Sequence, residues 1–552
     1  MAWEPETLEA PSTNVQPITE VAPGFPVEFE NPAHVELEWG GDRGHFPEAL
    51  TPLAGDYARI VGSTLNGWQS EYEGFPQRWH TGVWHGWVYY AFEPNATPDE
   101  WAGIRRRSTE LWRLLGDVTE AMWRDEILPE VQSLGARIDA VDAEAAAADV
   151  AEAWESSWLA AERAWKVHVM IAGSFQILGD LAEAYMIAMP DAPAGEAFRL
   201  IQGTRHELFE MELETERLAA MAAAAPAVAT ALRTGLRSLN DIRAVPEGET
   251  FAVAVEAFLE RHGHLGQSSD DLAIPPWAQA PHRILDELTK RLETPPPPAT
   301  ERQERLRREA EDLAAAARER LADRPEALAR FDRILDLARR IGPLSEIHNY
   351  WIDRAVQAHL HGLAMRVGRR LVREAVIEAA DDVFYLGRTE VADLLRRPRH
   401  VGGLVNERRA LHARQRQMTP APIVGTPGGD AAGGEQQDAS QPEAGEIESL
   451  RGTGASPGLV RGTARVVHRA DEFGRIMPGD IIICPASNPS WVPVFAIAGG
   501  LVSERGGLLS HAAVVAREFG LPAVVGVRDA MQAIVDGRQV EIDGTSGVVR
   551  LL

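Results

Sequence analysis

One stretch with few apolar side chains divides this sequence into two parts of different character. Residues 413–448 are rich in Pro, Gly, Gln, Ala and acidic side chains, a composition that cannot bury a core and is typical of a flexible linker. Long helical patterns precede it, whereas short β-branched runs separated by Gly and Asp follow it. We therefore predict a multidomain chain, with a large, mainly α-helical body and a small C-terminal domain over residues 449–552.

The part before the linker divides further by composition. Residues 1–26 mix Pro, Glu, Thr and Val without periodicity and are expected to form an extended lead-in. Residues 27–294 combine an unusual number of aromatic side chains with helical patterns, and we predict a helical, aromatic-rich domain there. A run of four prolines, Pro295–Pro298, ends it, and residues 299–412 are expected to be a second helical block of the same body.

Composition and charge exclude several classes of protein. The chain of 552 residues is 45% hydrophobic and 25% charged, as is usual for a globular protein, and its formal net charge of −27 argues against binding to nucleic acid. The sequence shows no signal peptide and no apolar run near the length of a membrane span. The single cysteine, Cys484, excludes internal disulfides. We expect a cytoplasmic protein that does not bind a membrane.

The sequence around His511 has the features of an anion site at the start of a helix. Gly506 and Gly507 permit a tight turn, Ser510 is a suitable N-cap, and the apolar pattern of a short helix follows. His511 would then lie in the first helical turn, at an exposed position. Free N–H groups and the helix dipole favour an anion there and disfavour an imidazolium.

These features suit a histidine that accepts a phosphoryl group. A neutral imidazole is nucleophilic near pH 7, and the phosphoryl group would carry the negative charge that such a site favours. Arg505 and Arg517 could reach the phosphate, and with Gly506, Gly507 and Ser510 they form the predicted phosphate-binding set. From the residues alone, a histidine that only caps the helix remains an alternative.

The motif GGLLSHAAVVAR resembles the signature of the phosphohistidine domain of phosphoenolpyruvate-utilising enzymes. The similarity extends over almost all of residues 449–552, including ASPGLVRGTARVV, the strand region PGDIIICP and the closing DGTSGVVRLL. The resemblance implies that His511 is the phosphorylated residue. It also implies a swivelling β/β/α domain that moves between two active sites.

The body has a weaker, discontinuous resemblance to the antibiotic-binding domain of rifampin phosphotransferases, over residues 41–53, 258–277 and 379–395. Those enzymes order their parts as an ATP-grasp domain, a helical acceptor-binding domain and a phosphohistidine domain, and this chain resembles the last two. We expect ATP and Mg²⁺ on a separate ATP-grasp subunit and no cofactor bound by this chain. Phenylphosphate synthase is a similar split system.

The acceptor site is expected in the helical body, where the aromatic side chains suit a small hydroxylated ring. Attack by a hydroxyl group on phosphohistidine needs a base, and His262 and His264 are the first candidates because they lie in one of the similar segments. Further candidates for the acceptor pocket are His45, His80, Trp84 and His85. The spacing of HGH and the nearby aspartates is too generic to indicate a metal site, and we predict none.

Together these features predict the phosphocarrier and acceptor-binding subunit of an ATP-dependent, dikinase-type phosphotransferase. The acceptor would be a small phenol, and AMP and phosphate would be released. One alternative is an antibiotic-modifying enzyme of the rifampin type that lacks its own ATP domain. Another is a non-catalytic regulatory protein that is phosphorylated on His511.

Overall fold

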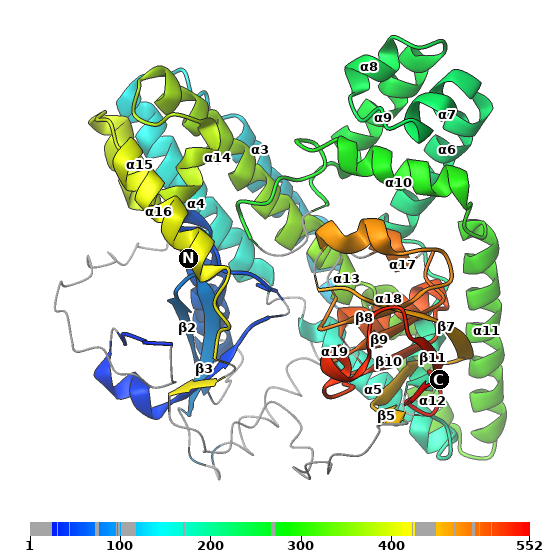
Figure 1. The fold of residues 1–552 in the computed structure, drawn as a ribbon. Coiled ribbons are helices and arrows are strands. Elements are labelled where there is room, and N and C mark those ends of the chain that lie inside the picture. The colour runs from blue at the N-terminus through cyan, green and yellow to red at the C-terminus, as the bar shows by residue number, and fades with distance from the viewer. Residues whose placement is uncertain are drawn as a thin grey trace.

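The structure is a computed structural model of the chain. It describes residues 25–29, 31–43, 45–71, 77–94, 97, 100, 118–168, 172–193, 195–266, 271–421, 423–425, 449–468, 470–487, 492–495, 497–508 and 510–552. Most of the predicted lead-in, and residues 426–448 of the predicted linker, lie outside these ranges. The described residues confirm the predicted fold class, a mainly helical body with a small C-terminal domain built on a sheet (Figure 1).

A four-stranded antiparallel sheet lies at the start of the body, in a region that the sequence analysis described as helical. Its strands are β1 (Glu38–Gly41), β2 (Gln77–Trp84), β3 (Trp87–Pro94) and β4 (Ile423–Gly425), in the order β2-β3-β1-β4. His85 and Gly86 form the β2–β3 turn with φ of 51° and 78°, the conformation that a two-residue hairpin turn requires. Aromatic side chains pack on this sheet, because alternating aromatic residues fit a pleated surface.

The fourth strand corrects one boundary of the predicted linker. Val424 pairs with Trp39 of β1 and is fully buried, so residues 423–425 belong to the body and do not form a free coil. Two β-branched residues after a proline are too short a signal to be recognised as a strand. The chain therefore remains part of the body for about ten residues beyond α16 (Gly402–Gln415).

Helices from both sides of the proline run share the largest core. This core is formed by helices from residues 52–201 and from residues 299–412, so the two predicted blocks do not have separate interiors. The helices from the first range are α1 (Pro52–Glu71), α3 (Leu128–Asp139), α4 (Ala147–His168) and α5 (Ala172–Ala188). Those from the second are α11 (Ala299–Arg320), α12 (Pro325–Ile341), α13 (Leu344–His348), α14 (Ala355–Arg373), α15 (Arg388–Arg396) and α16.

Shorter helical turns connect these elements. They are η1 (Pro32–Glu36), η2 (Trp123–Ile127), η4 (Glu196–Ile201), η5 (Asn349–Arg354) and η6 (Ala380–Tyr385), of which η2 and η5 are π-helical. Because α13, η5 and α14 follow one another without a break, residues 344–373 form one continuous helix.

The helices between these two ranges form a separate lobe. They are α6 (Glu207–Ala224), α7 (Pro226–Arg233), α8 (Leu239–Arg243), α9 (Gly248–His262) and α10 (His282–Glu293). Their apolar residues form one cluster with those on one face of the C-terminal domain. In Figure 1 the lobe lies above that domain, so it covers the domain from one side.

The C-terminal domain is an eight-stranded mixed sheet with helices against it. The strand order is β5-β12-β11-β7-β8-β9-β10-β6, and β7, β8, β9 and β10 are parallel neighbours. The strands are β5 (Ser449–Arg451), β6 (Thr453–Ser456), β7 (Leu459–Val466), β8 (Ile481–Cys484), β9 (Gly500–Ser503), β10 (Ala523–Val525), β11 (Gln539–Asp543) and β12 (Val548–Leu551). The helices are η7 (Ala470–Arg475), α17 (Val492–Phe495), α18 (His511–Phe519) and α19 (Ala530–Ala533).

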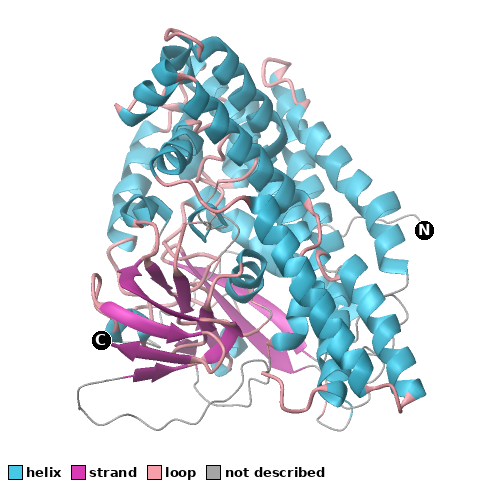
Figure 2. Ribbon diagram, turned by 90° about the vertical axis from the view of Figure 1, so that its right-hand side faces the viewer, coloured by secondary structure: helices cyan, strands magenta, loops and turns pink. Residues whose placement is uncertain are grey.

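The view in Figure 2 shows the strands gathered at one end of the molecule, with the helices filling the rest. Among the described residues, no helix combines the length and the apolar character that a membrane span needs.

Candidate functional site

His511 is the first residue of α18, as the sequence predicted. Ser510 has the extended backbone of an N-cap, although its side chain does not hydrogen-bond to the helix, and Gly520 ends the helix in the left-handed conformation. Helix α18 connects the parallel strands β9 and β10, so its N-terminus lies at the end of the sheet where β9 finishes. The prediction of an exposed side chain is wrong, because the body covers the imidazole and leaves 11% of the side chain accessible.

A carboxylate of the body contacts the His511 ring. Glu346 of α13 lies with Oε2 at 2.6 Å from Nδ1 of His511, and 5% of its side chain is exposed. The other ring nitrogen, Nε2, is buried and has no hydrogen-bond partner among the described residues. The site is therefore shared between two domains, with the imidazole from one and the carboxylate from the other.

Further contacts hold the C-terminal domain against the body. The amide of Gln202 donates to the carbonyl of Arg517 at 2.5 Å, and Nζ of Lys290 donates to the carbonyl of Phe473 at 2.9 Å. The guanidinium of Arg302 lies 4.5 Å from the ring centre of Phe519, at the end of α18. The structure thus shows the domain in its docked position on the helical body.

The predicted phosphate-binding residues do not all face His511. Gly506 adopts φ of 109°, which explains the glycine at this turn, and there is open space around Gly507. The guanidinium of Arg517 donates to the carbonyls of Leu508 and Ala455 and stacks on Phe198, so it has a structural role in this state. Arg505 is exposed on the loop before α18.

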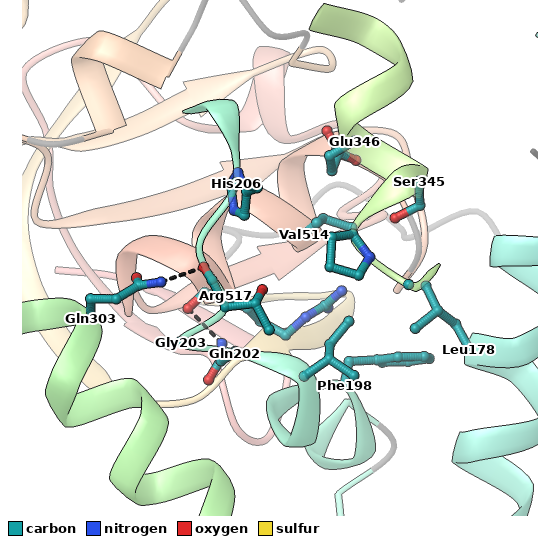
Figure 3. A pocket seen from close by; sticks show the side chains of 14 residues that line it. Leu178, Phe198, Gln202, Gly203, His206, Gln303, Ser345, Glu346, Val514 and Arg517 are labelled. Carbon is teal, nitrogen blue, oxygen red and sulfur yellow. Dashed lines mark hydrogen bonds between the residues drawn. The ribbon is translucent and has the colours of Figure 1, made fainter. Parts of the chain in front are cut away.

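A small cavity with a mixed polar and apolar lining lies next to Glu346, between α18, α11 and α13. Its volume is about 30 Å³, and Gln202, His206, Gln303 and Arg517 contribute polar groups to its lining. Figure 3 shows Glu346 and Ser345 projecting from one helix on the side opposite Gln303 and Gln202. Ligand pockets usually have volumes of about 300–1,000 Å³, so an aromatic acceptor does not fit here.

The helix that carries Glu346 also contacts both predicted base candidates. Tyr350 lies four residues after Glu346, one helical turn away, and its hydroxyl is 2.8 Å from Nδ1 of His262. The ring of His264 lies edge-on to Tyr350 at 4.4 Å between centres and parallel to Trp351 at 6.2 Å. The structure therefore groups His511, His262 and His264 around one helix, although they are far apart in sequence.

The two base candidates differ in what their ring nitrogens contact. Burial lowers the pKa of His262, and the carboxylate of Glu214, 3.4 Å from its Nε2, partly opposes that effect. Burial lowers the pKa of His264 to about 3, and Nε2 of each histidine has no hydrogen-bond partner among the described residues. His264 is thus neutral near pH 7 and a weak proton acceptor, whereas a proton on Nε2 of His262 would face the carboxylate of Glu214.

The candidates in the N-terminal sheet have local partners instead. His45 bonds to Asp42, His80 to Glu93 and His85 to the carbonyl of Pro26. The indole of Trp84 donates to the carbonyl of Glu28 and packs on Trp39. His80, Trp84 and His85 pack among the aromatic side chains of the sheet, whereas His45 is exposed on the loop after β1. Figure 1 shows this sheet on the side of the molecule away from α18.

Two side chains of α14 anchor the segment that follows the histidine motif. Gln357 donates to the carbonyl of Asp271 at 2.6 Å, and Nδ1 of the buried His361 lies 2.8 Å from the carbonyl of Leu272. Burial lowers the pKa of His361 to about 4, so the folded protein keeps this ring neutral at pH values where the unfolded chain protonates it.

This difference predicts a loss of stability in acid. Above about pH 6.5 the ring is neutral in both states, and the free energy of unfolding does not depend on its protonation. As the pH falls toward 4, the unfolded chain binds a proton that the folded protein does not, and the free energy of unfolding decreases by about 3 kcal/mol. His361→Gln keeps an amide donor for the Leu272 carbonyl and should lose less stability over this range, which urea unfolding at several pH values would measure. An equal decrease in the free energy of unfolding of the variant and the wild type over this pH range would show that His361 is not the group responsible.

Comparison with known proteins agrees with this geometry. Residues 476–547, which include His511, match the mobile domain of PEP-utilising enzymes. Residues 165–346 match the fourth domain of rifampicin phosphotransferase and include His262 and His264, with Glu346 as the last matched residue. Both predicted resemblances are thereby confirmed.

Three curated relatives illustrate the range of matches. The chain is 28% identical over its full length to chondramide synthase CmdD of Chondromyces crocatus, of which it covers 15%. It is 31% identical over 57% of its length to a rifampicin phosphotransferase of Streptomyces sviceus and covers 36% of that protein. It is 28% identical over 55% of its length to the uncharacterised phosphotransferase YvkC of Bacillus subtilis and covers 37% of that protein.

The chain thus spans well under half the length of these relatives. Two of its parts nevertheless have clear similarities: residues 476–547 are similar to the mobile domain of the PEP-utilising enzymes, and residues 165–346 are similar to the fourth domain of rifampicin phosphotransferase.

Proposed function

We propose that this chain is the phosphocarrier and acceptor-binding component of an ATP-dependent, dikinase-type phosphotransferase. His511 receives a phosphoryl group from a separate ATP-grasp subunit, which holds ATP and Mg²⁺, and passes it to the hydroxyl of a small phenolic acceptor. AMP and phosphate are the other products. The main support for the proposal is the docked position of His511 on the helical body, part of which is similar to a domain of rifampicin phosphotransferase. In this position Nε2 of His511 has no hydrogen-bond partner among the described residues.

The transfer step follows from the groups around His511. The acceptor oxygen attacks phosphorus, a P–O bond forms, the P–Nε2 bond breaks, and its electron pair returns to the imidazole. We propose His262 as the base that takes the hydroxyl proton. Its Nδ1 is held by the Tyr350 hydroxyl, which leaves Nε2 as the proton acceptor, and the carboxylate of Glu214 at 3.4 Å would stabilise the protonated ring. His264, whose pKa burial lowers to about 3, then lines the site beside Tyr350.

The match over residues 165–346 favours a second candidate acceptor, an antibiotic of the rifampicin class. The same carrier chemistry applies, and only the body's specificity differs. Phenols and macrocyclic antibiotics should therefore be tested together.

The proposal is tested by combining the purified chain with a candidate ATP-grasp subunit, Mg·ATP and a panel of phenols and macrocycles. AMP release that depends on one acceptor and on both proteins supports the proposal. AMP release that no acceptor changes would favour the regulatory alternative, in which phosphorylation of His511 is the end of the reaction.

A further inference from the structure

Glu346 is a buried carboxylate whose environment offers it one side-chain partner. Among the described residues, its carboxylate forms one hydrogen bond, to His511, and it has no arginine or lysine counter-ion. Burying a carboxylate with so little compensation is costly, and such groups usually have a function beyond stability. The nearest candidate counter-ion in the lining of the adjacent cavity, Arg517, donates to backbone carbonyls instead.

The geometry also determines which ring nitrogen can react. A carboxylate at 2.6 Å from Nδ1 accepts a hydrogen bond from an N–H at that position, and this leaves the lone pair on Nε2. Nε2 is the nitrogen without a partner, so it is the one that can carry the phosphoryl group. Glu346 therefore fixes the tautomer in which His511 is a nucleophile at Nε2.

Once Nε2 carries a phosphoryl group, the state of Nδ1 controls how easily the P–N bond breaks. If Nδ1 carries a hydrogen, the leaving group is a neutral imidazole; if it does not, the leaving group is an imidazolide anion, which is far less stable. A carboxylate beside Nδ1 stabilises the ring that carries this hydrogen. Because Glu346 belongs to the body, it can act on the ring only in the docked state.

We propose that Glu346 is the positioning residue that activates phosphorylated His511, so that docking on the body switches the phosphoryl group from stable to transferable. This inference rests on the proposed function and deepens it. In the step, the P–Nε2 bond breaks, its electron pair remains on Nε2, the hydrogen stays on Nδ1 within the hydrogen bond to Glu346, and the phosphoryl group joins the acceptor oxygen. Away from the body, the phosphorylated ring lacks this carboxylate and keeps its phosphoryl group for longer.

The test uses the full chain and needs neither the natural donor nor the natural acceptor. Phosphoramidate, a small compound that phosphorylates histidine without an enzyme, loads the chain, and ³¹P NMR with peptide mapping follows the phosphate on His511 as water removes it. In Glu346→Gln, an amide of nearly the same shape remains, and we expect the loss to be about 10-fold to 100-fold slower than in the wild type. Glu346→Asp keeps the carboxylate and should restore part of the rate.

Two controls separate this role from a structural one. Glu541→Gln alters another buried glutamate, on β11 of the C-terminal domain, which is bonded to Arg461 and Arg550 and not to His511, and should leave the rate unchanged. His511→Ala identifies the signal that belongs to this residue. Loss from Glu346→Gln at the wild-type rate or faster would overturn the inference while leaving the proposed function intact. Failure of wild-type His511 to take up any phosphate would overturn the proposed function itself.

Discussion

Replacing His511 with alanine is expected to abolish phosphoryl uptake by this chain. Removal of a catalytic nucleophile commonly costs at least about 10³-fold in rate, and a carrier residue has no substitute nearby. Intact-mass measurement after incubation with the ATP-grasp subunit and Mg·ATP should show an acid-labile phosphate on the wild type and none on the variant. Continued uptake by the alanine variant would show that another residue is the carrier.

The alanine variant also removes the partner of the buried Glu346 carboxylate, so a second variant is needed to separate chemistry from docking. His511→Gln retains an amide N–H that can donate to Glu346 but cannot carry a phosphoryl group, and it should be equally inactive. His468→Ala changes an exposed histidine of the same domain and should take up phosphate normally. Thermal unfolding of all three variants would show that the domain is still folded.

The second large effect is expected at Arg291, in the lobe that covers the C-terminal domain. Its guanidinium donates two hydrogen bonds of 3.0 Å to Glu212 and one of 2.8 Å to Glu287, and it is 2% exposed. Arg291→Met would leave two buried carboxylates without this counter-ion, which typically costs about 3–5 kcal/mol. We expect a large drop in the thermal midpoint, with faster hydrogen exchange in α6 and α10.

A surface pair provides the matched comparison. Arg307 bonds to Glu304 at 2.9 Å on the exposed side of α11, and Arg307→Met should leave the thermal midpoint unchanged. Arg291 holds Glu212, and Glu212 also lies 3.9 Å from Arg302, whose guanidinium packs on Phe519 of the C-terminal domain. Loss of Arg291 should therefore also weaken docking of the C-terminal domain. Equal drops in the thermal midpoint for Arg291→Met and Arg307→Met would contradict the claim that the buried ion pairs of Arg291 stabilise the protein more than an exposed pair does.

The C-terminal domain could be predicted well because its signals are local. The Gly506–Gly507 turn, the Ser510 cap and the Gly520 stop all lie within a few residues of His511, and each requires a specific backbone conformation. The family motif then added the chemistry. The β-branched runs after the linker are strands in the structure, as in β8 and β11, whereas β5 (SLR) and β6 (TGAS) are short and contain no such run.

The N-terminal sheet could have been recognised but was not. The hairpin over residues 77–94 has aromatic and β-branched residues around a His85–Gly86 turn, a strand signal that the search for helical periodicity overlooked. The other two strands of this sheet, β1 and β4, could not be predicted from the sequence. β4 is three residues long, and it pairs with β1 across more than 380 residues of chain.

Glu346 could not be predicted from sequence. It lies 165 residues from His511, in the first turn of the helix over residues 344–373, which none of the quoted motifs included. Glu346 acquires its role through the contact between the body and the C-terminal domain, and no local sequence pattern encodes that contact. The histidines in the HGH segment were found by resemblance, yet only the structure shows that both contact Tyr350 of the helix that carries Glu346.

The central claim is that His511 passes its phosphoryl group to an acceptor hydroxyl at the surface of the body. The most direct measurement loads the chain with ³²P on His511, removes the donor, and adds members of the phenol and macrocycle panel one at a time. The account predicts that one acceptor accelerates the loss of phosphohistidine and gains an equal amount of label as a phosphate ester. Loss of the label as inorganic phosphate alone, at a rate that none of the acceptors changes, would contradict it.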